Sequence, residues 1–116
     1  MAARLIRYVT SRILKAGVSL FMLATIYILF CLHALGDYFL QTDFLAKTKG
    51  SNFWHMVVHC LLYTIPFVVY FGIDNRILLL FLTHFTIDSL KAHYNKIDYM
   101  MDQVLHISIL IPLYLR

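Results

Sequence analysis

The residues of this chain that are best suited to chemistry form four pairs with one common spacing. Each pair combines two histidines, or a histidine and an aspartate, separated by three residues. The pairs are His33 and Asp37, His55 and His59, His84 and Asp88, and Asp102 and His106. In a helix this spacing places both side chains on the same face, one turn apart. Because imidazole nitrogens and carboxylate oxygens are ligands of zinc, iron and manganese, the pattern predicts a divalent-metal site.

The predicted ligands come from all four pairs. They are His33, Asp37, His59, His84, Asp88, Asp102 and His106. His55 is left out because it stands where its segment begins, and the helix can start after it. Four-helix bundles that hold two metal ions use carboxylates and histidines at similar helical spacing, so the set suits either one ion or two.

Three residues are candidates for direct roles in catalysis. A bound metal lowers the pKa of a coordinated water, and Asp37 or Asp88 would then serve as the general base. Lys91 follows Asp88 by three residues and shares its helix face. Its ammonium would hold an anionic group such as a phosphate. The alternative is that Lys91 extends to the lipid head groups.

A structural interpretation of the pairs is the main alternative to metal binding. A histidine inside a membrane protein is commonly a hydrogen-bonded packing residue, and a polar link between helices is worth about 1 kcal/mol. Chains of ionisable groups also carry protons across membranes. The common spacing and depth of all four pairs favours metal binding or catalysis over these alternatives.

The segments that carry the pairs are strongly apolar. Of the 116 residues, 61% are hydrophobic and 14% are charged, whereas soluble domains carry about 25% charged residues. Lipid leaves helices as the option for so short a chain. We therefore predict an all-α integral membrane protein whose single domain, residues 17–116, has four short transmembrane helices. They are expected over residues 17–40, 55–71, 77–91 and 99–115.

A basic segment, residues 1–16, precedes this domain. Its cations are Arg4, Arg7, Arg12 and Lys15. Cations on one helix face and apolar residues on another are typical of an amphipathic helix in the lipid interface. The segment suits a simple extension of the first span equally well. The net charge of +4 is attributed to head-group contacts, and no nucleic-acid partner is expected.

The order of the segments places all four pairs at one end of a bundle. The pairs lie at the C-terminal ends of the first and third segments and at the N-terminal ends of the second and fourth. The first two pairs also recur as the last two pairs, each displaced along the chain by a similar number of residues. This predicts two parallel-repeat hairpins with the site at their interface. The last two segments reach the roughly 20 residues of a span only if their polar pairs lie within the membrane.

The sequence also resembles a family of small bacterial and phage membrane proteins catalogued as domain of unknown function 3307. The matching residues are His33 to Asp43, Lys47 to Lys49, His59, His84 to Lys91, and Asp102, Gln103 and His106. The resemblance extends from Leu32 to about Leu115 and implies the fold and the place of the site, but no settled activity. The expected location is the bacterial inner (cytoplasmic) membrane. A weaker similarity exists to small membrane proteins described as metal-dependent hydrolases.

Two classes of function follow from these observations. The first is a membrane-embedded metal-dependent hydrolase that acts on a lipid or isoprenoid phosphate. The second is a non-enzymatic protein that conducts protons or metal ions, or modulates a larger membrane partner, with the pairs as a structural network. The chain has little room for a deep pocket, so a homo-oligomer or a membrane partner is expected in either case. Metal analysis of the purified protein discriminates between the two.

Overall fold

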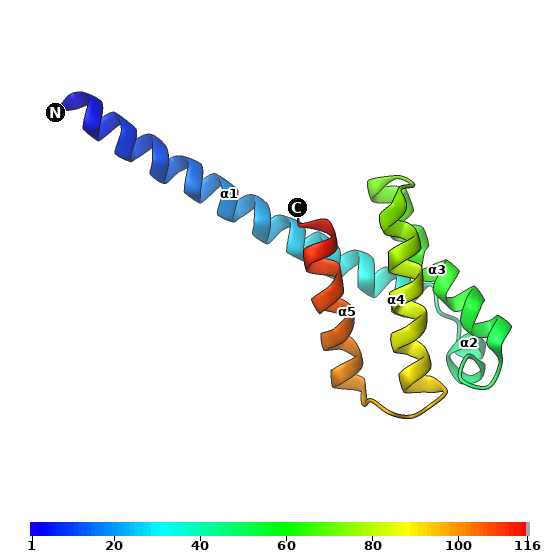
Figure 1. Ribbon diagram of the computed structural model, residues 1–116. Helices are drawn as coiled ribbons and strands as arrows, with labels where there is room; N and C mark the ends of the chain where they lie inside the picture. Colours follow the sequence, from blue (N-terminus) through cyan, green and yellow to red (C-terminus); the bar gives the residue numbers. More distant parts are fainter. Residues whose placement is uncertain (116) are drawn as a thin grey trace.

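The computed structural model describes residues 1–115, and all of its regular structure is helical (Figure 1). The elements are α1 (Ala2–Ala34), η1 (Leu35–Phe39), α2 (Asp43–Thr48), α3 (Phe53–Phe71), α4 (Asn75–Ala92) and α5 (Tyr99–Tyr114). Residues 1–115 contain no strand. The predicted all-α fold is confirmed.

Two of these helical segments are long and apolar enough to cross a membrane. They are Ala2–Phe39, which joins α1 and η1, and Phe53–Phe71, which is α3. The other two long helices are shorter, with 18 residues in α4 and 16 in α5, whereas a span needs about 20. Four transmembrane helices and their arrangement as parallel repeats therefore stay a prediction.

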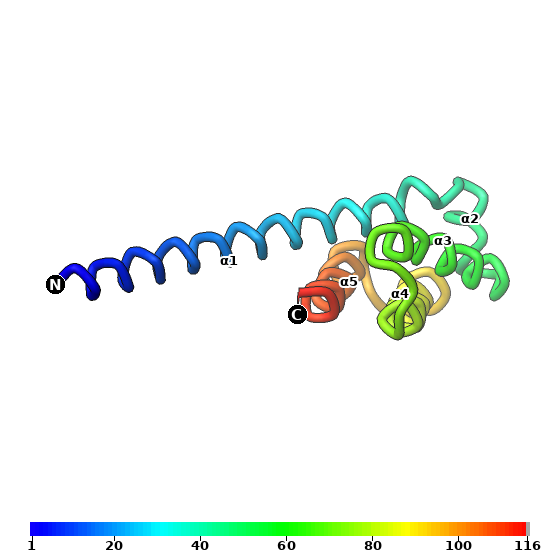
Figure 2. Tube along the Cα trace, turned by 90° about the horizontal axis from the view of Figure 1, so that it is seen from above, coloured from blue at the N-terminus to red at the C-terminus, as the bar shows by residue number. Residues whose placement is uncertain are grey.

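The basic N-terminal segment continues into the first apolar segment without a break. α1 is one helix of 33 residues, and its N-terminal part extends well away from the other helices (Figures 1 and 2). Residues 1–24 are exposed, and the first buried side chain of the helix is Leu29. Only the C-terminal part of α1 therefore contributes to the packed domain.

A widened helical turn joins α1 to the rest of the domain. In η1 the hydrogen bond from Leu40 N reaches back five residues to Leu35 O, over 3.0 Å. Gly36 lies in this turn so close to α3 that a Cβ atom there would be 2.7 Å from the backbone oxygen of Tyr63. The absence of a side chain at Gly36 lets η1 approach α3, which brings Asp37 against that helix. Turns of this kind are frequent at functional sites.

Short polar side chains cap the N-terminal ends of α3 and α4. Asn52 accepts a hydrogen bond from Trp54 N, over 2.9 Å, at the start of α3. Asp74 accepts from Arg76 N at the start of α4, over 2.8 Å. The hydrogen bond from the Arg76 side chain lowers the pKa of the Asp74 carboxyl. These caps satisfy backbone N–H groups that have no partner within the helix.

Helices α3, α4 and α5 form an up-down-up arrangement, with the end of α1 packed across it (Figure 1). The connections before α3 and between α4 and α5 lie at one end, and the α3–α4 turn lies at the other. The apolar core is formed by Leu29, Tyr63, Phe67, Leu80, Leu110 and Tyr114. At the end with the two connections the interior is polar instead, and this is where the predicted ligands lie.

Candidate metal centre

All of the predicted ligands are buried in this polar interior, with exposed fractions of 6% or less. They come from the end of α1 (His33), η1 (Asp37), α3 (His59), α4 (His84 and Asp88) and α5 (Asp102 and His106). The structure thus brings together residues that lie far apart in the sequence. Their role as metal ligands stays a prediction.

Four of these residues form the centre of the cluster. Asp37, His59, His84 and Asp88 each offer one ligand atom, and these atoms all lie within 4.8 Å of one another. The Nε2 atom of His59 is 3.3 Å from Asp37 Oδ1 and 2.9 Å from Asp88 Oδ2. The Nε2 atom of His84 is 3.7 Å from Asp37 Oδ1 and 3.8 Å from Asp88 Oδ1. Ligand atoms on a tetrahedral zinc ion with bonds of about 2.0–2.2 Å are roughly 3.3–3.6 Å apart, so the donor set fits a metal of this kind.

One nitrogen at this centre has more polar neighbours than it can hydrogen-bond at the same time. Besides the two carboxylates, His59 Nε2 lies 3.0 Å from His84 Nε2 and 3.1 Å from the Nζ atom of Lys49. A neutral imidazole nitrogen has either one N–H or one lone pair, and so cannot donate to the carboxylates and accept from the lysine together. A divalent cation among these atoms would bind both histidine lone pairs and both carboxylates.

His106 and Asp102 extend the centre toward α5. The Nε2 atom of His106 is 3.6 Å from Asp88 Oδ1 and has no hydrogen-bond partner among residues 1–115. Its Nδ1 atom is 2.8 Å from the backbone oxygen of Asp102, to which it donates when that nitrogen carries the proton. This arrangement aims Nε2 of His106 at the cluster. Asp88, Asp102 and His106 can therefore form a second group of ligands that shares Asp88 with the first.

His33 lies at the edge of the cluster, and both of its ring nitrogens already have partners. Nδ1 is 2.9 Å from the hydroxyl of Tyr63, and Nε2 is 3.0 Å from Oε1 of Gln103. The nearest carboxylate oxygen of Asp37 is 3.8 Å away. His33 would have to exchange one hydrogen bond for a metal bond to act as a ligand, whereas His106 Nε2 would not.

Lys49 and Tyr63 contact the cluster but are not among the predicted site residues. The Lys49 ammonium donates to Asp88 Oδ2 over 2.5 Å. The ring of Tyr63 stacks on that of His84, with centroids 3.6 Å apart and an angle of 4° between the planes. Tyr63 follows His59 by four residues, so the helical spacing that linked the pairs also placed it on the site face. Lys49 lies in the connection after α2 and follows no such spacing; its only signal in the sequence is its place in the Lys47 to Lys49 stretch of the family resemblance.

Lys91 is paired and does not present a free ammonium to the cluster. Its Nζ atom donates to Asp102 Oδ2 over 2.8 Å and lies 5.0 Å from the ring centre of Tyr99. Its predicted role in holding an anion would require it to leave Asp102. His55 lies outside the cluster, where its Nδ1 atom is 2.8 Å from the hydroxyl of Thr48.

The hydrogen bonding of the second ring nitrogen of the central histidines differs from that in most established metal sites. A ligating histidine usually donates its other ring N–H to a carboxylate, a backbone oxygen or a water. The Nδ1 atoms of His59 and His84 have no hydrogen-bond partner within the described part of the chain. Packing holds these rings instead, including the stack of Tyr63 on His84.

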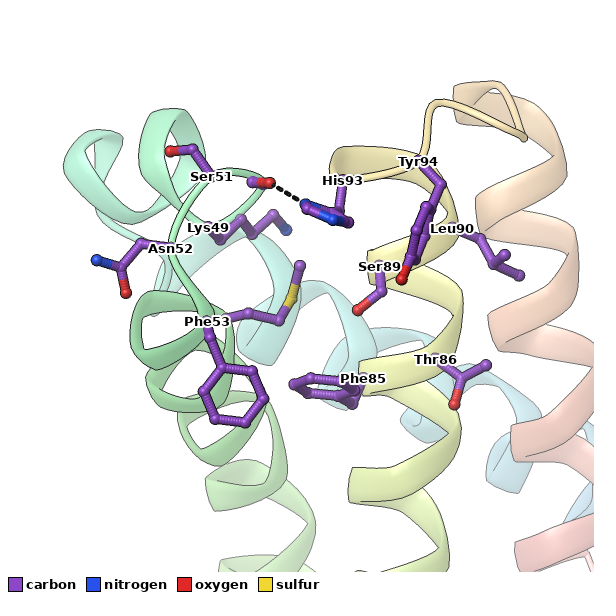
Figure 3. A pocket seen from close by; sticks show the side chains of 12 residues that line it. Lys49, Ser51, Asn52, Phe53, Phe85, Thr86, Ser89, Leu90, His93 and Tyr94 are labelled. Carbon is purple, nitrogen blue, oxygen red and sulfur yellow. Dashed lines mark hydrogen bonds between the residues drawn. The ribbon is translucent and has the colours of Figure 1, made fainter.

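A cavity of about 570 Å³ adjoins the cluster between α3 and α4 (Figure 3). Phe53, Phe85 and Tyr94 contribute aromatic surface to it, and Ser51 and Ser89 contribute hydroxyls. Lys49 also lines this cavity and at the same time contacts Asp88 and His59. The cavity therefore reaches the cluster at Lys49.

The comparisons with known proteins identify a family without an assigned function. A family described as a protein of unknown function (DUF3307) matches residues 25–116. No curated protein and no solved structure matches the chain. The match leaves out residues 1–24, the part of α1 that does not pack on the domain. Because it covers most of the sequence, the chain belongs to the DUF3307 family.

Proposed function

We propose that the chain is an integral membrane protein whose His/Asp cluster binds one or two divalent metal ions, zinc, iron or manganese, and hydrolyses a membrane-associated phosphate ester. One observation carries the proposal. The Nε2 atoms of His59 and His84, from two different helices, lie 3.0 Å apart and both face the carboxylates of Asp37 and Asp88. Placing two carboxylates and two imidazoles together in a buried site is costly unless their charge and lone pairs are compensated.

The distribution of apolar side chains supports the membrane part of the proposal. Large side chains on the outer surface are widely exposed, among them Phe21 at 71%, Val69 at 80% and Leu78 at 64%. The histidines and aspartates of the cluster instead lie in the interior, at one end of the bundle. Soluble proteins rarely expose so many large apolar side chains, whereas lipid would cover them. α4 and α5 are about 27 Å and 24 Å long, close to the roughly 30 Å of a hydrocarbon core.

The carboxylates are not equivalent, and the difference suggests their roles. Asp88 and Asp102 each pair with a lysine. The ionisable partners of Asp37 in residues 1–115 are all histidines. Asp37 is therefore the carboxylate best placed to accept a proton, and Asp88 the one best placed to remain a charged ligand.

The proposed reaction is an attack of water on the phosphorus of a lipid or isoprenoid phosphate. A divalent ion at such a site makes a coordinated water more acidic and polarises a phosphoryl oxygen. Asp37 takes a proton from the water while the water oxygen forms a bond to phosphorus. The ester P–O bond then breaks, and Asp37 passes the proton to the leaving alcohol. The proposed location is the bacterial inner membrane, with the bilayer and a second copy of the chain or another membrane protein as partners.

The lysine contacts favour a second candidate, a non-enzymatic His/Asp network that holds the helices together or carries protons. Lys49 and Lys91 each neutralise one carboxylate without any metal. In this case the cluster would need no metal ion, because the lysines already pair with two of its carboxylates. The two candidates differ in whether the purified protein holds metal.

Elemental analysis of the full chain tests the proposal. The protein is purified in nonionic detergent, exposed to zinc, iron or manganese, and dialysed. We expect one or two ions per chain for the parent and for His55→Gln, and a sharp loss for His84→Gln, since an amide keeps hydrogen bonding but is a poor ligand. Phosphate release from a lipid phosphate in mixed micelles should stop on addition of a chelator. Equal metal content in the parent and His84→Gln would contradict metal binding at this cluster, and bound metal without phosphate release would contradict the hydrolase.

A further inference from the structure

Lys49 belongs both to the cluster and to the neighbouring cavity. It caps the C-terminal end of α2, and its ammonium lies 2.5 Å from Asp88 Oδ2 and 3.1 Å from His59 Nε2. The same residue is part of the cavity wall between α3 and α4 (Figure 3). Its side chain is 11% exposed. A rotation of this side chain would move the ammonium from the cluster into the cavity.

A metal ion and the Lys49 ammonium cannot use the cluster together. When it carries no proton, His59 Nε2 has one lone pair, which either accepts from Lys49 or binds a metal. The short contact with Asp88 Oδ2 also places the ammonium where a metal bound to that oxygen would repel it. Binding of a metal to His59 and Asp88 therefore requires the ammonium to leave.

The cavity offers the displaced ammonium no counter-charge from the protein. None of the residues that line it, in the part of the chain that the structure describes, is acidic. Ser51, Asn52 and Ser89 provide polar groups around it, and the N-terminal end of α3 at Phe53 adds the positive end of a helix dipole. An ammonium in these surroundings would be neutralised best by an anion from outside the chain.

Most of the rest of the cavity wall is apolar, with Thr86 and His93 as the polar exceptions. Phe53, Met56, Phe85, Leu90 and Tyr94 line it. A ligand that fills the cavity therefore combines an anionic group, placed near Lys49, with an apolar body along the aromatic side chains. Sites of this kind use apolar walls for affinity and a few polar groups for orientation.

We infer that Lys49 is a displaceable internal cation, which a metal at His59 and Asp88 drives into the cavity to bind the phosphate of an amphipathic ligand. This inference rests on the proposed metal site. It adds a binding site for the ligand and a reason why that site forms only when the metal is bound. The same phosphate chemistry would also hold a free phosphate ion, although the apolar wall would then have no partner.

The first test measures zinc affinity by competition with a chromophoric chelator, on the full chain in nonionic detergent. Lys49→Met removes the competing ammonium and should bind zinc at least about tenfold more tightly than the parent. Lys49→Arg keeps the charge and should stay close to the parent. Lys47→Met is the matched control, because Lys47 is exposed and lies on α2, two residues before Lys49. If Lys49→Met does not fold, Lys49→Gln, which keeps a donor for Asp88 without the charge, replaces it.

The second test measures binding of dodecyl phosphate, inorganic phosphate and the neutral dodecyl maltoside at saturating zinc. Dodecyl phosphate should bind the parent, Lys49→Arg and Lys47→Met similarly, and Lys49→Met at least about tenfold more weakly. Without zinc the parent should bind it weakly, since the ammonium remains on Asp88. Equal binding of inorganic phosphate would identify a free anion as the ligand and overturn the amphipathic assignment. Equal binding of dodecyl phosphate to Lys49→Met and the parent would overturn the role of Lys49.

The outcomes separate this inference from the proposed function. Zinc binding by the parent with unchanged affinity in Lys49→Met would leave the metal site standing and overturn the displacement. Zinc binding by Lys49→Met but not by the parent would support competition by the ammonium and contradict a metal site in the native chain. Absence of zinc from both variants would overturn both claims.

Discussion

The Nε2 atoms of His59 and His84 face each other across 3.0 Å. They come from neighbouring antiparallel helices, α3 and α4, and both rings are fully buried or nearly so, with exposed fractions of 0 and 1%. Two neutral imidazoles can share one proton at this distance only if one ring carries it on Nε2 and the other on Nδ1. Two lone pairs that converge together with two carboxylates are instead the arrangement that a divalent cation binds.

The hydroxyl of Tyr63 should contribute to stability through His33. Tyr63→Phe removes the hydrogen bond to His33 Nδ1 and keeps the ring stacked on His84. Hydrogen bonds between membrane helices average about 0.6 kcal/mol, and we expect a destabilisation of this order. Thermal unfolding in detergent measures it.

Tyr114→Phe is the matched control for this change. The hydroxyl of Tyr114 is buried but has no hydrogen-bond partner within residues 1–115. Its removal should leave stability unchanged or raise it slightly, because no buried polar group then goes unpaired. A larger loss of stability for Tyr114→Phe than for Tyr63→Phe would contradict the hydrogen-bond assignment.

Gly36→Ala should distort the site. The added methyl would lie 2.7 Å from the backbone oxygen of Tyr63, so η1 would have to move away from α3 and carry Asp37 with it. Overpacking of this kind costs about 1–3 kcal/mol. We expect a lower unfolding temperature and weaker metal binding.

Gly17→Ala provides the comparison within α1. A methyl group at Gly17 would meet no atom within 4 Å, and alanine is favoured over glycine inside a helix by about 0.5–1 kcal/mol. This variant should therefore be as stable as the parent or more so, with unchanged metal binding. If Gly36→Ala and Gly17→Ala have equal stability and equal metal binding, the close approach of η1 to α3 is not needed.

The N-terminal part of α1 should not be needed for the cluster. Residues 1–24 are exposed, and they lie outside the region that the family matches. A chain that lacks residues 1–16 should bind metal with the affinity of the parent, while its binding to vesicles that contain anionic lipid should weaken, because four cations are removed. A loss of metal from the shortened chain would place this segment in the site.

Cysteine labelling should show the two ends of the bundle on opposite sides of the membrane. Ser51 lies in the connection before α3, and Asn75 begins α4 after the turn at the other end. Both are exposed. If α3 spans the bilayer, an impermeant maleimide applied to intact cells should label only one of Ser51→Cys and Asn75→Cys, and the parent, which retains Cys31 and Cys60, gives the background. Labelling of both from the same side would contradict the span.

The sequence predicted the long helices and the shared face of most of the paired residues because both follow from local spacing, but it did not predict α2. It did not predict the widened turn of η1, since that turn depends on how closely Gly36 can approach Tyr63, a contact between distant parts of the chain. Lys49 was missed for a similar reason. It lies outside every periodic segment, and only the packing of the connection against the end of α4 carries it to Asp88. That packing is tight, since a Cβ atom at Gly50 would be 2.3 Å from Ala92 O.

Lys91 shows the opposite case, a residue that the spacing predicted but whose ion-pair partner, Asp102, it did not. Its place on the site face follows from its spacing to Asp88. Its partner Asp102 comes from the next helix, and the sequence pattern contains no information on which carboxylate a flexible lysine will reach. The ion pair between them depends on the relative height of α4 and α5, which the connection over residues 93–98 sets.

X-ray absorption at the zinc edge tests the central claim most directly. The full chain, loaded with zinc in lipid nanodiscs, should show a first shell of nitrogen and oxygen at about 2.0–2.2 Å, with the outer-shell scattering of at least two imidazoles and no sulfur. The His59→Gln/His84→Gln variant should lose the imidazole scattering along with most of the bound zinc. An unchanged spectrum and zinc content in that variant, or a parent chain that retains no zinc, would contradict a metal centre formed by these two histidines.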